Sequence, residues 1–177
     1  MKNLVTFYRS FMLTRSVYML LAGIVLLFII SFFIPILLMA AQLLLLLLVC
    51  LVVVDAIVLY ARRHGLSGKR NAAERFSNGD ENIIHILLGN HYTFRVRVEL
   101  IDELPFQFLQ MNRKRKAVLK GGQEYHLTYI LRPLQRGEYV FGNINAFVTS
   151  PLTLVQRRFV FEEQQTIPAY PSFHQLK

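Results

Sequence analysis

The sequence predicts a two-helix transmembrane hairpin followed by an all-β antiparallel sandwich of the immunoglobulin-like type. From Ser16 to Val54 it contains no Asp, Glu, Lys or Arg, although the chain of 177 residues carries a formal net charge of +9. An uncharged apolar run of that length can enter a bilayer and is too long for a buried core helix. Beyond residue 78, apolar and polar residues alternate with period two, which indicates half-buried strands.

The apolar run is expected to cross the membrane twice. One straight helix over it would be about 58 Å long at ~1.5 Å per residue, against a hydrocarbon core of ~30 Å. Pro35 lies near its middle, and proline ends or kinks a helix. We therefore place the spans at about 17–34 and 36–59, within a tail and hairpin of residues 1–60. One long tilted, kinked helix is the alternative. A secretory signal peptide is excluded, because the run is about twice too long for its apolar h-region.

Basic residues flank both ends of the predicted hairpin, whereas its connecting turn has none. Lys and Arg accumulate on the cytoplasmic side of membrane helices. Both termini are therefore predicted to lie in the cytoplasm. The residues that carry this prediction precede the first span or follow the second: Lys2, Arg9, Arg15, Arg62, Arg63, Lys69 and Arg70.

Asp55 is a carboxylate within the second apolar stretch. An ionisable residue inside a membrane is a functional-site hypothesis, here a proton or ion role. The other interpretation is that Asp55, about two turns from Arg62, reaches water or a basic partner at the cytoplasmic interface. The second interpretation is preferred because two helices offer little room for a transport path.

The polar, basic segment 61–77 is interpreted as a juxtamembrane linker, and residues 78–166 as a cytoplasmic β-sandwich. Alternation is clearest in YTFRVRVEL, where Tyr92 to Leu100 place every second residue on one face. Turn residues between the apolar segments recur at a spacing typical of a sandwich. Strands are predicted at 82–90, 92–100, 106–111, 124–131, 138–148 and 152–163.

Residues that could support catalysis or bind metal are scarce in the predicted sandwich. The only cysteine, Cys50, lies in a span, and neither an HExxH motif nor a Cys/His cluster occurs. Asp102 and Glu103 are adjacent and point to opposite faces of an extended chain, so they are interpreted as turn residues rather than an acid–base pair. His85 and His126 are predicted to be packed or surface residues. No catalytic residue, metal or cofactor is predicted, and the chain is interpreted as non-enzymatic.

A basic run, NRKRK, occupies residues 112–116. It is interpreted as an exposed loop, because burying four unpaired charges would be costly. A contact with anionic lipid is the functional alternative, since a tethered domain lies near a negatively charged leaflet. Nucleic-acid binding is less well supported, because a sandwich lacks a recognition helix. The residues concerned are Arg113, Lys114, Arg115 and Lys116.

Several short motifs follow the apolar run in a fixed order: RFSNGDENIIHILLGN, IDELP, LTYILRPLQRGEYVFGNINAFVTSPLTLVQRR and TIPAYPSF. In this order they resemble the N-terminal part of the bacterial domain-of-unknown-function 58 proteins. In that family a membrane hairpin precedes a β-sandwich and then a von Willebrand factor A-like domain. The residues that carry the resemblance are Gly79, Asp80, Asn90, Leu104, Pro105, Arg136, Gly137, Tyr170 and Pro171.

The resemblance implies a place in the bacterial cytoplasmic (inner) membrane and, for a complete protein, association with a MoxR-type AAA+ ATPase. It also implies that residues 167–177 begin the A-like domain, so the chain is expected to be a fragment. The Arg136–Gly137 turn is then a scaffold element between core strands, with Tyr129, Tyr139 and Phe141 spaced to pack the sandwich.

The function expected from the sequence is that of a membrane-anchored, non-catalytic interaction or scaffold protein. It would be a partner of a MoxR-type AAA+ ATPase in the assembly or maturation of other proteins. The alternative is a subunit of a membrane enzyme or transporter that uses Asp55.

Overall fold

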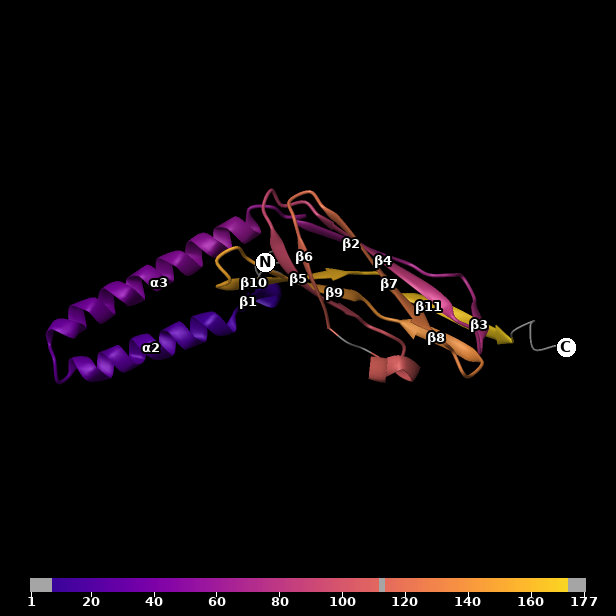
Figure 1. Cartoon of the computed structure of the whole chain (residues 1–177), viewed down its shortest axis with the longest axis horizontal. Helices are drawn as coiled ribbons and strands as arrows, with labels where there is room; N and C mark the ends of the chain where they lie inside the picture. The colour runs from indigo at the N-terminus through magenta and orange to yellow at the C-terminus, as the bar shows by residue number, and fades with distance from the viewer. Residues whose placement is uncertain (1–7, 112–113, 172–177) are drawn as a thin grey trace. The chain divides into compact units, whose positions relative to one another are not determined.

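The computed structural model describes residues 8–111 and 114–171, and Figure 1 traces the order of its elements. The chain divides into two compact units. Within the described residues the first unit holds 8–63 together with 148–158. The second holds 64–147, apart from the gap at 112–113, together with 159–171.

Two apolar helices dominate the first unit: α2 (Arg15–Ser31) and α3 (Ile36–Tyr60). They lie side by side and run in opposite directions (Figure 1). Pro35 is the N-terminal cap of α3 with φ −56°, a backbone angle that suits a helix start. The predicted break at Pro35 is confirmed, although α2 ends three residues before the predicted end of the first span.

One helix of the described residues is long and apolar enough to cross a membrane. This is α3, with 25 residues; α2 has 17. Large apolar side chains are exposed all along α3, from Ile36 to Val58. An apolar surface of this kind suits contact with lipid.

A short strand and a β-hairpin complete the first unit. The strand β1 (Phe11–Leu13) pairs antiparallel with β10 (Val155–Phe161), with Leu13 opposite Val155. The chain enters this unit through β9 (Ile144–Thr149) and leaves it through β10. The turn between these strands, from Ser150 to Leu154, therefore belongs to the same unit as the helices.

The second unit is built from mostly antiparallel sheets, as the sequence predicts. One contains β2 (Leu66–Asn71), β4 (Asn82–Asn90) and β7 (Glu124–Leu131), in that order. Another contains β3 (Phe76–Asn78), β11 (Gln165–Pro171) and β8 (Gly137–Phe141), in which β3 runs parallel to β11. In a further sheet β9 neighbours β5 (Val96–Asp102), which pairs with β6 (Arg115–Leu119).

The core of the second unit forms where the alternating strands place their apolar residues. In β4 the alternation is complete, since Ile84, Ile86 and Leu88 are buried. The predicted inward positions of Tyr139 and Phe141 are confirmed, and Tyr129 packs at the edge of the same cluster. The buried members of that cluster are Phe76, Ile84, Phe108, Leu131, Tyr139, Phe141, Ile167 and Ala169.

Two predicted domain boundaries are wrong. The segment predicted as a linker contains β2, which pairs with β4 and buries Leu66 and Arg70. Basic residues favour a solvent-exposed linker, whereas Arg70 is buried in this strand. Residues 167–171 do not begin another domain but belong to β11, where Ile167 is fully buried. Residues 172–177 lie outside the described residues.

Several of the predicted strands also differ from the structure. Residues 106–111 form a short 3₁₀ helix, η1 (Phe106–Met111), because the N–H of Phe108 turns back to donate to the Pro105 carbonyl at 2.8 Å. The predicted strand 138–148 is divided into β8 and β9 at Gly142 and Asn143. Over 92–100, the strand β5 begins only at Val96, although its alternating burial is confirmed.

Candidate functional site

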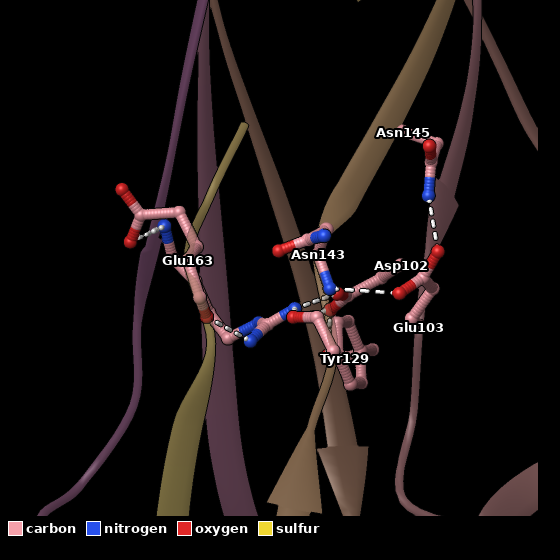
Figure 2. A network of polar contacts seen from close by, with 8 residues as sticks. Asp102, Glu103, Tyr129, Asn143, Asn145 and Glu163 are labelled. Atoms are coloured by element: carbon pink, nitrogen blue, oxygen red, sulfur yellow. Dashed lines mark hydrogen bonds and ion pairs between the residues drawn. The ribbon is translucent and has the colours of Figure 1, made fainter. Parts of the chain in front are cut away.

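A polar cluster of the second unit is centred on a buried ion pair between Arg70 and Asp102. Figure 2 labels Asp102 among its polar neighbours. Arg70 lies on β2, and Asp102 is the last residue of β5. Their side chains are 0% and 8% exposed. The guanidinium Nε donates to Asp102 Oδ2 at 3.3 Å, and Nη2 donates to Asp102 Oδ1. This bidentate contact matches the planar geometry of the guanidinium and the carboxylate.

The rest of the guanidinium is also occupied. Nη1 donates to the Glu163 carbonyl at 2.8 Å, and Nη2 donates to the Gly142 carbonyl at 3.1 Å. The Phe141 ring lies 4.8 Å from the guanidinium carbon, within reach of a cation–π contact. Arg70 thus joins β2 to the chain at Gly142 and Glu163, and its buried charge has both a counter-ion and acceptors.

Tyr129 completes the ion pair from β7. Its hydroxyl donates to Asp102 Oδ2. Burial, and then the neighbouring Asp102 carboxylate, raise the pKa of the Tyr129 phenol well above its usual range. Tyr129 therefore remains a neutral donor at physiological pH.

Glu103 serves a different contact, although it is adjacent to Asp102 (Figure 2). Its Oε2 accepts the Asn143 backbone N–H at 2.9 Å, and its Oε1 accepts from Asn145 Nδ2 at 2.7 Å. A Cβ on Gly142 would lie 2.3 Å from Glu103 Oε2 and 2.7 Å from Glu103 Cβ, so a larger residue there would displace Glu103. The prediction that both acids are simple turn residues is wrong for Asp102, which is buried at the end of a strand.

This polar network offers little to a substrate. Each carboxylate oxygen of Asp102 already accepts a hydrogen bond from Arg70 or Tyr129. Glu103 is occupied at both oxygens as well. Among the described residues, no group of His, Cys, Asp or Glu side chains could hold a metal ion. The arrangement is suited to fastening strands together.

Asp55 is the second buried carboxylate, and it lies in the first unit. Its exposed fraction is 1%. Its Oδ2 accepts from the Ser150 hydroxyl, and from the backbone N–H groups of Leu154 and Val155 at 3.1 Å each. The prediction that Asp55 reaches water or a basic partner is therefore wrong. Its partners lie about a hundred residues later, in the turn between β9 and β10.

Arg157 makes a second attachment between β10 and α3 within the same unit. Its Nη1 donates to the carbonyls of Leu59 and Arg62 at 3.1 and 2.8 Å, and its Nη2 to that of Arg63 at 3.0 Å. Its guanidinium carbon lies 4.5 Å from the centre of the Tyr60 ring. A cation at a helix C-terminus satisfies carbonyls that have no partner inside the helix. Sequence reasoning missed this cap, because Arg157 lies in an alternating strand.

The basic run differs from its prediction in one respect. Lys114, Arg115 and Lys116 are exposed as predicted, but Arg115 and Lys116 begin the strand β6 rather than forming a loop. Pairing with β5 places Lys116 opposite Glu99, and Lys116 Nζ lies 3.2 Å from Glu99 Oε1. Arg113 lies outside the described residues.

The residues that carry the family resemblance have mainly backbone roles where the structure describes them. Gly79 has a positive φ of 83° in the turn after β3, and the Asp80 carbonyl accepts from Asn82 Nδ2 at 3.0 Å. Asn90 is buried and uses Nδ2 to donate to the Lys120 carbonyl at 2.8 Å. Its Oδ1 accepts the Tyr92 N–H at 3.0 Å.

The remaining motif residues lie at element boundaries. Leu104 packs at the edge of the core, and Pro105 begins the turn into η1. Arg136 is exposed and Gly137 has φ 140°, while the Tyr139 hydroxyl donates to the Gln135 carbonyl at 2.8 Å and so holds this corner. Tyr170 and Pro171 end β11. Both strand histidines, His85 and His126, are exposed, in agreement with the surface prediction.

Comparison with known proteins assigns this chain to no family. The sequence matches no family model and no curated protein. Among solved structures, the human CEP192 ASH/PapD-like domain 7 is 12% identical with a TM-score of 0.45, over 61% of this chain and 87% of that one. The CARDB domain of PF1109 from Pyrococcus furiosus is 13% identical with a TM-score of 0.38, over 59% and 87%. Similarity at this level carries no argument about ligand or activity.

Proposed function

We propose that this chain is a membrane-anchored, non-catalytic interaction module of the bacterial cytoplasmic membrane, with both termini in the cytoplasm. In this proposal α2 and α3 form a two-span anchor, and the β-sandwich is presented to a MoxR-type AAA+ ATPase that acts in the assembly or maturation of other proteins. The ATPase partner and the bacterial membrane come from the motif resemblance. The apolar, exposed surface of α3 supports the anchor.

The observation that carries the proposal is the environment of Asp55. A transporter subunit needs an ionisable group that can exchange protons or ions along a path. Asp55 instead accepts three hydrogen bonds from the turn between β9 and β10. In the second unit, Arg70 and Asp102 neutralise each other. The chemistry-bearing side chains are thus engaged in holding the chain together, which favours a scaffold over an enzyme.

A pull-down of the tagged full chain from a detergent extract of bacterial membranes tests the partnership. An AAA+ ATPase should be recovered in a nucleotide-dependent manner. A matched chain lacking α2 and α3 separates recruitment by the sandwich from recovery through the anchor. Repeated recovery of no AAA+ ATPase would contradict the partnership.

Reporter fusions before Met1 and after Lys177 test the topology, and alkaline phosphatase activity at the C-terminus would overturn it.

The alternative, a membrane enzyme or transporter subunit, predicts that Asp55→Asn abolishes a measurable transport or hydrolytic activity. The scaffold proposal predicts that this substitution affects only the folding of the first unit.

A further inference from the structure

We propose that the turn between β9 and β10, Ser150–Leu154, is a membrane-inserting tip. It would lie at the boundary between acyl chains and headgroups, on the cytoplasmic side of the bilayer that α3 crosses. The partner is the lipid of that bilayer. This inference rests on the proposed anchor, since it takes α3 as a membrane helix.

The depth of Asp55 follows from the geometry of α3. A hydrocarbon core of ~30 Å corresponds to about 20 helical residues at ~1.5 Å each. Counted from Ile36, the first residue of α3, this length ends at about residue 55. Asp55 is therefore placed at the inner boundary of the hydrocarbon. The last turn of α3, ending at Tyr60, then passes through the headgroup layer.

The length of α2 independently indicates the same depth in the bilayer. Counted back from Ser31, the 17 residues of α2 span about 26 Å, so its start lies near the same boundary. Thr14 immediately precedes α2 and also binds the tip. Its N–H donates to the Leu154 carbonyl at 3.0 Å, and its hydroxyl donates to the Thr153 carbonyl at 2.5 Å. The tip is thus attached to the inner ends of both helices.

The tip has the chemistry that a low-dielectric layer demands. Pro151 has no N–H, and the N–H groups of Leu154 and Val155 are taken by Asp55. The Ser150 N–H donates to the Val155 carbonyl at 3.0 Å, and the Thr153 N–H to the Ser150 carbonyl at 3.1 Å. Backbone groups that enter the edge of a membrane must be satisfied internally. Protein acceptors therefore satisfy the N–H groups of Ser150, Thr153, Leu154 and Val155 without water.

The outward face of the tip is apolar. Pro151 is exposed, and Leu152 is 48% exposed. An exposed leucine side chain is more stable among acyl chains than in water. Tyr8 and Tyr18 are exposed at the α2 end of the same unit, as expected of aromatic side chains at a membrane interface. Arg15 begins α2 and Arg62 follows the end of α3. Both are exposed, and their positive charges suit contact with anionic headgroups.

Tryptophan fluorescence of the full chain in vesicles tests the depth, because the sequence contains no Trp. Leu152→Trp would report on the tip, and Leu47→Trp, at an exposed position of α3, on the anchor. Lipids brominated near the headgroup should quench the tip tryptophan more than lipids brominated near the chain ends. The reverse order is expected for Leu47→Trp. Aqueous iodide should quench neither strongly.

The outcomes separate this inference from the proposed anchor. If Leu47→Trp is quenched by lipid and Leu152→Trp only by iodide, the anchor stands and the membrane tip is overturned. If neither is quenched by lipid, the anchor itself is overturned. Quenching of Leu152→Trp mainly by deep bromines would overturn its place at the boundary.

Adding Asp55→Leu to Leu152→Trp should reduce the quenching by lipids brominated near the headgroup. Asp55→Asn, which keeps one acceptor oxygen, should reduce it less. Unchanged quenching in both would overturn the role of Asp55 as its anchor point.

Discussion

Asp55 and Asp102 are both buried carboxylates, but they stabilise their units by different means. Asp102 is paired with the Arg70 guanidinium and also accepts from the Tyr129 hydroxyl. The partners that the structure gives Asp55 are a hydroxyl and two backbone N–H groups, and none of them carries a charge. Removing one partner of an ion pair leaves the other charge buried, whereas removing Asp55 leaves only polar groups unsatisfied. The difference predicts a ranking of substitutions.

The largest effect is expected from Arg70→Met. It leaves the Asp102 carboxylate buried without its counter-ion, which typically costs about 3–5 kcal/mol of unfolding free energy. Denaturant unfolding of the full chain in detergent, followed by the β-sheet circular dichroism signal, measures the loss. The matched double variant, Arg70→Met with Asp102→Leu, should recover most of it, because apolar residues can replace a buried ion pair. An unfolding free energy of Arg70→Met within about 0.5 kcal/mol of the parent would show that the ion pair is accessible to solvent.

A smaller and local effect is expected from Asp55→Ala. It removes the acceptor of two backbone N–H groups and one hydroxyl, at a cost of roughly 2–4 kcal/mol for hydrogen bonds to a charged group. Amide hydrogen exchange should accelerate at Leu154 and Val155 while the strands of the second unit stay protected. Cys50→Ala, at an exposed position on the same helix, is the control. Equal exchange in both variants would contradict the role of Asp55 in holding the turn.

Tyr129→Phe removes the neutral hydrogen-bond donor of Asp102, the Tyr129 hydroxyl, and keeps the charged donor, Arg70. The loss of one hydrogen bond to a carboxylate should cost about 1.5–3 kcal/mol at neutral pH. The folded-state pKa of Tyr129 lies above the unfolded value of about 10. The stability linked to this proton is therefore complete below pH ~10 and is lost as the pH rises above it.

Unfolding free energies measured across the alkaline range test the sign of this dependence. The parent chain should lose stability above pH ~10 more steeply than Tyr129→Phe. Tyr170→Phe serves as the control, because Tyr170 is half exposed and lies near the end of β11. Parallel pH profiles for the parent and Tyr129→Phe would show that the phenol does not remain protonated in the folded chain.

Local patterns in the sequence predict the elements better than the contacts between them. Apolar alternation predicts both ends of β4 and β7 correctly, and Pro35 predicts the break between α2 and α3. The same rules missed β2, because its inward residue Arg70 is charged and is tolerated only through a partner 32 residues later. Asp55 is similar, since its partners lie 95 to 100 residues away. A buried charge is explained by its partner, and no local pattern identifies a partner so distant.

The smallest effect on stability is expected in the basic run, because its described residues Lys114, Arg115 and Lys116 are exposed. Replacing Arg113, Lys114, Arg115 and Lys116 by Gln removes the Lys116–Glu99 contact, and an exposed pair contributes about 0.2–1 kcal/mol. The unfolding free energy should therefore change by less than about 1 kcal/mol. A loss as large as that of Arg70→Met would show that the run is structural.

The same variant tests the proposed contact of the run with anionic lipid. A Trp at the exposed β6 position Val118 would transfer energy to dansyl-labelled lipid in nanodiscs that contain the full chain. Transfer should be greater in anionic than in neutral discs and should fall with salt, because charges are screened over ~8 Å at physiological ionic strength. The fourfold Gln variant should abolish this dependence. Arg95→Gln with Arg97→Gln, at exposed positions just before and within β5, should retain it. Transfer that is insensitive to lipid charge in the parent would remove the lipid role and leave the run as a solvated strand end.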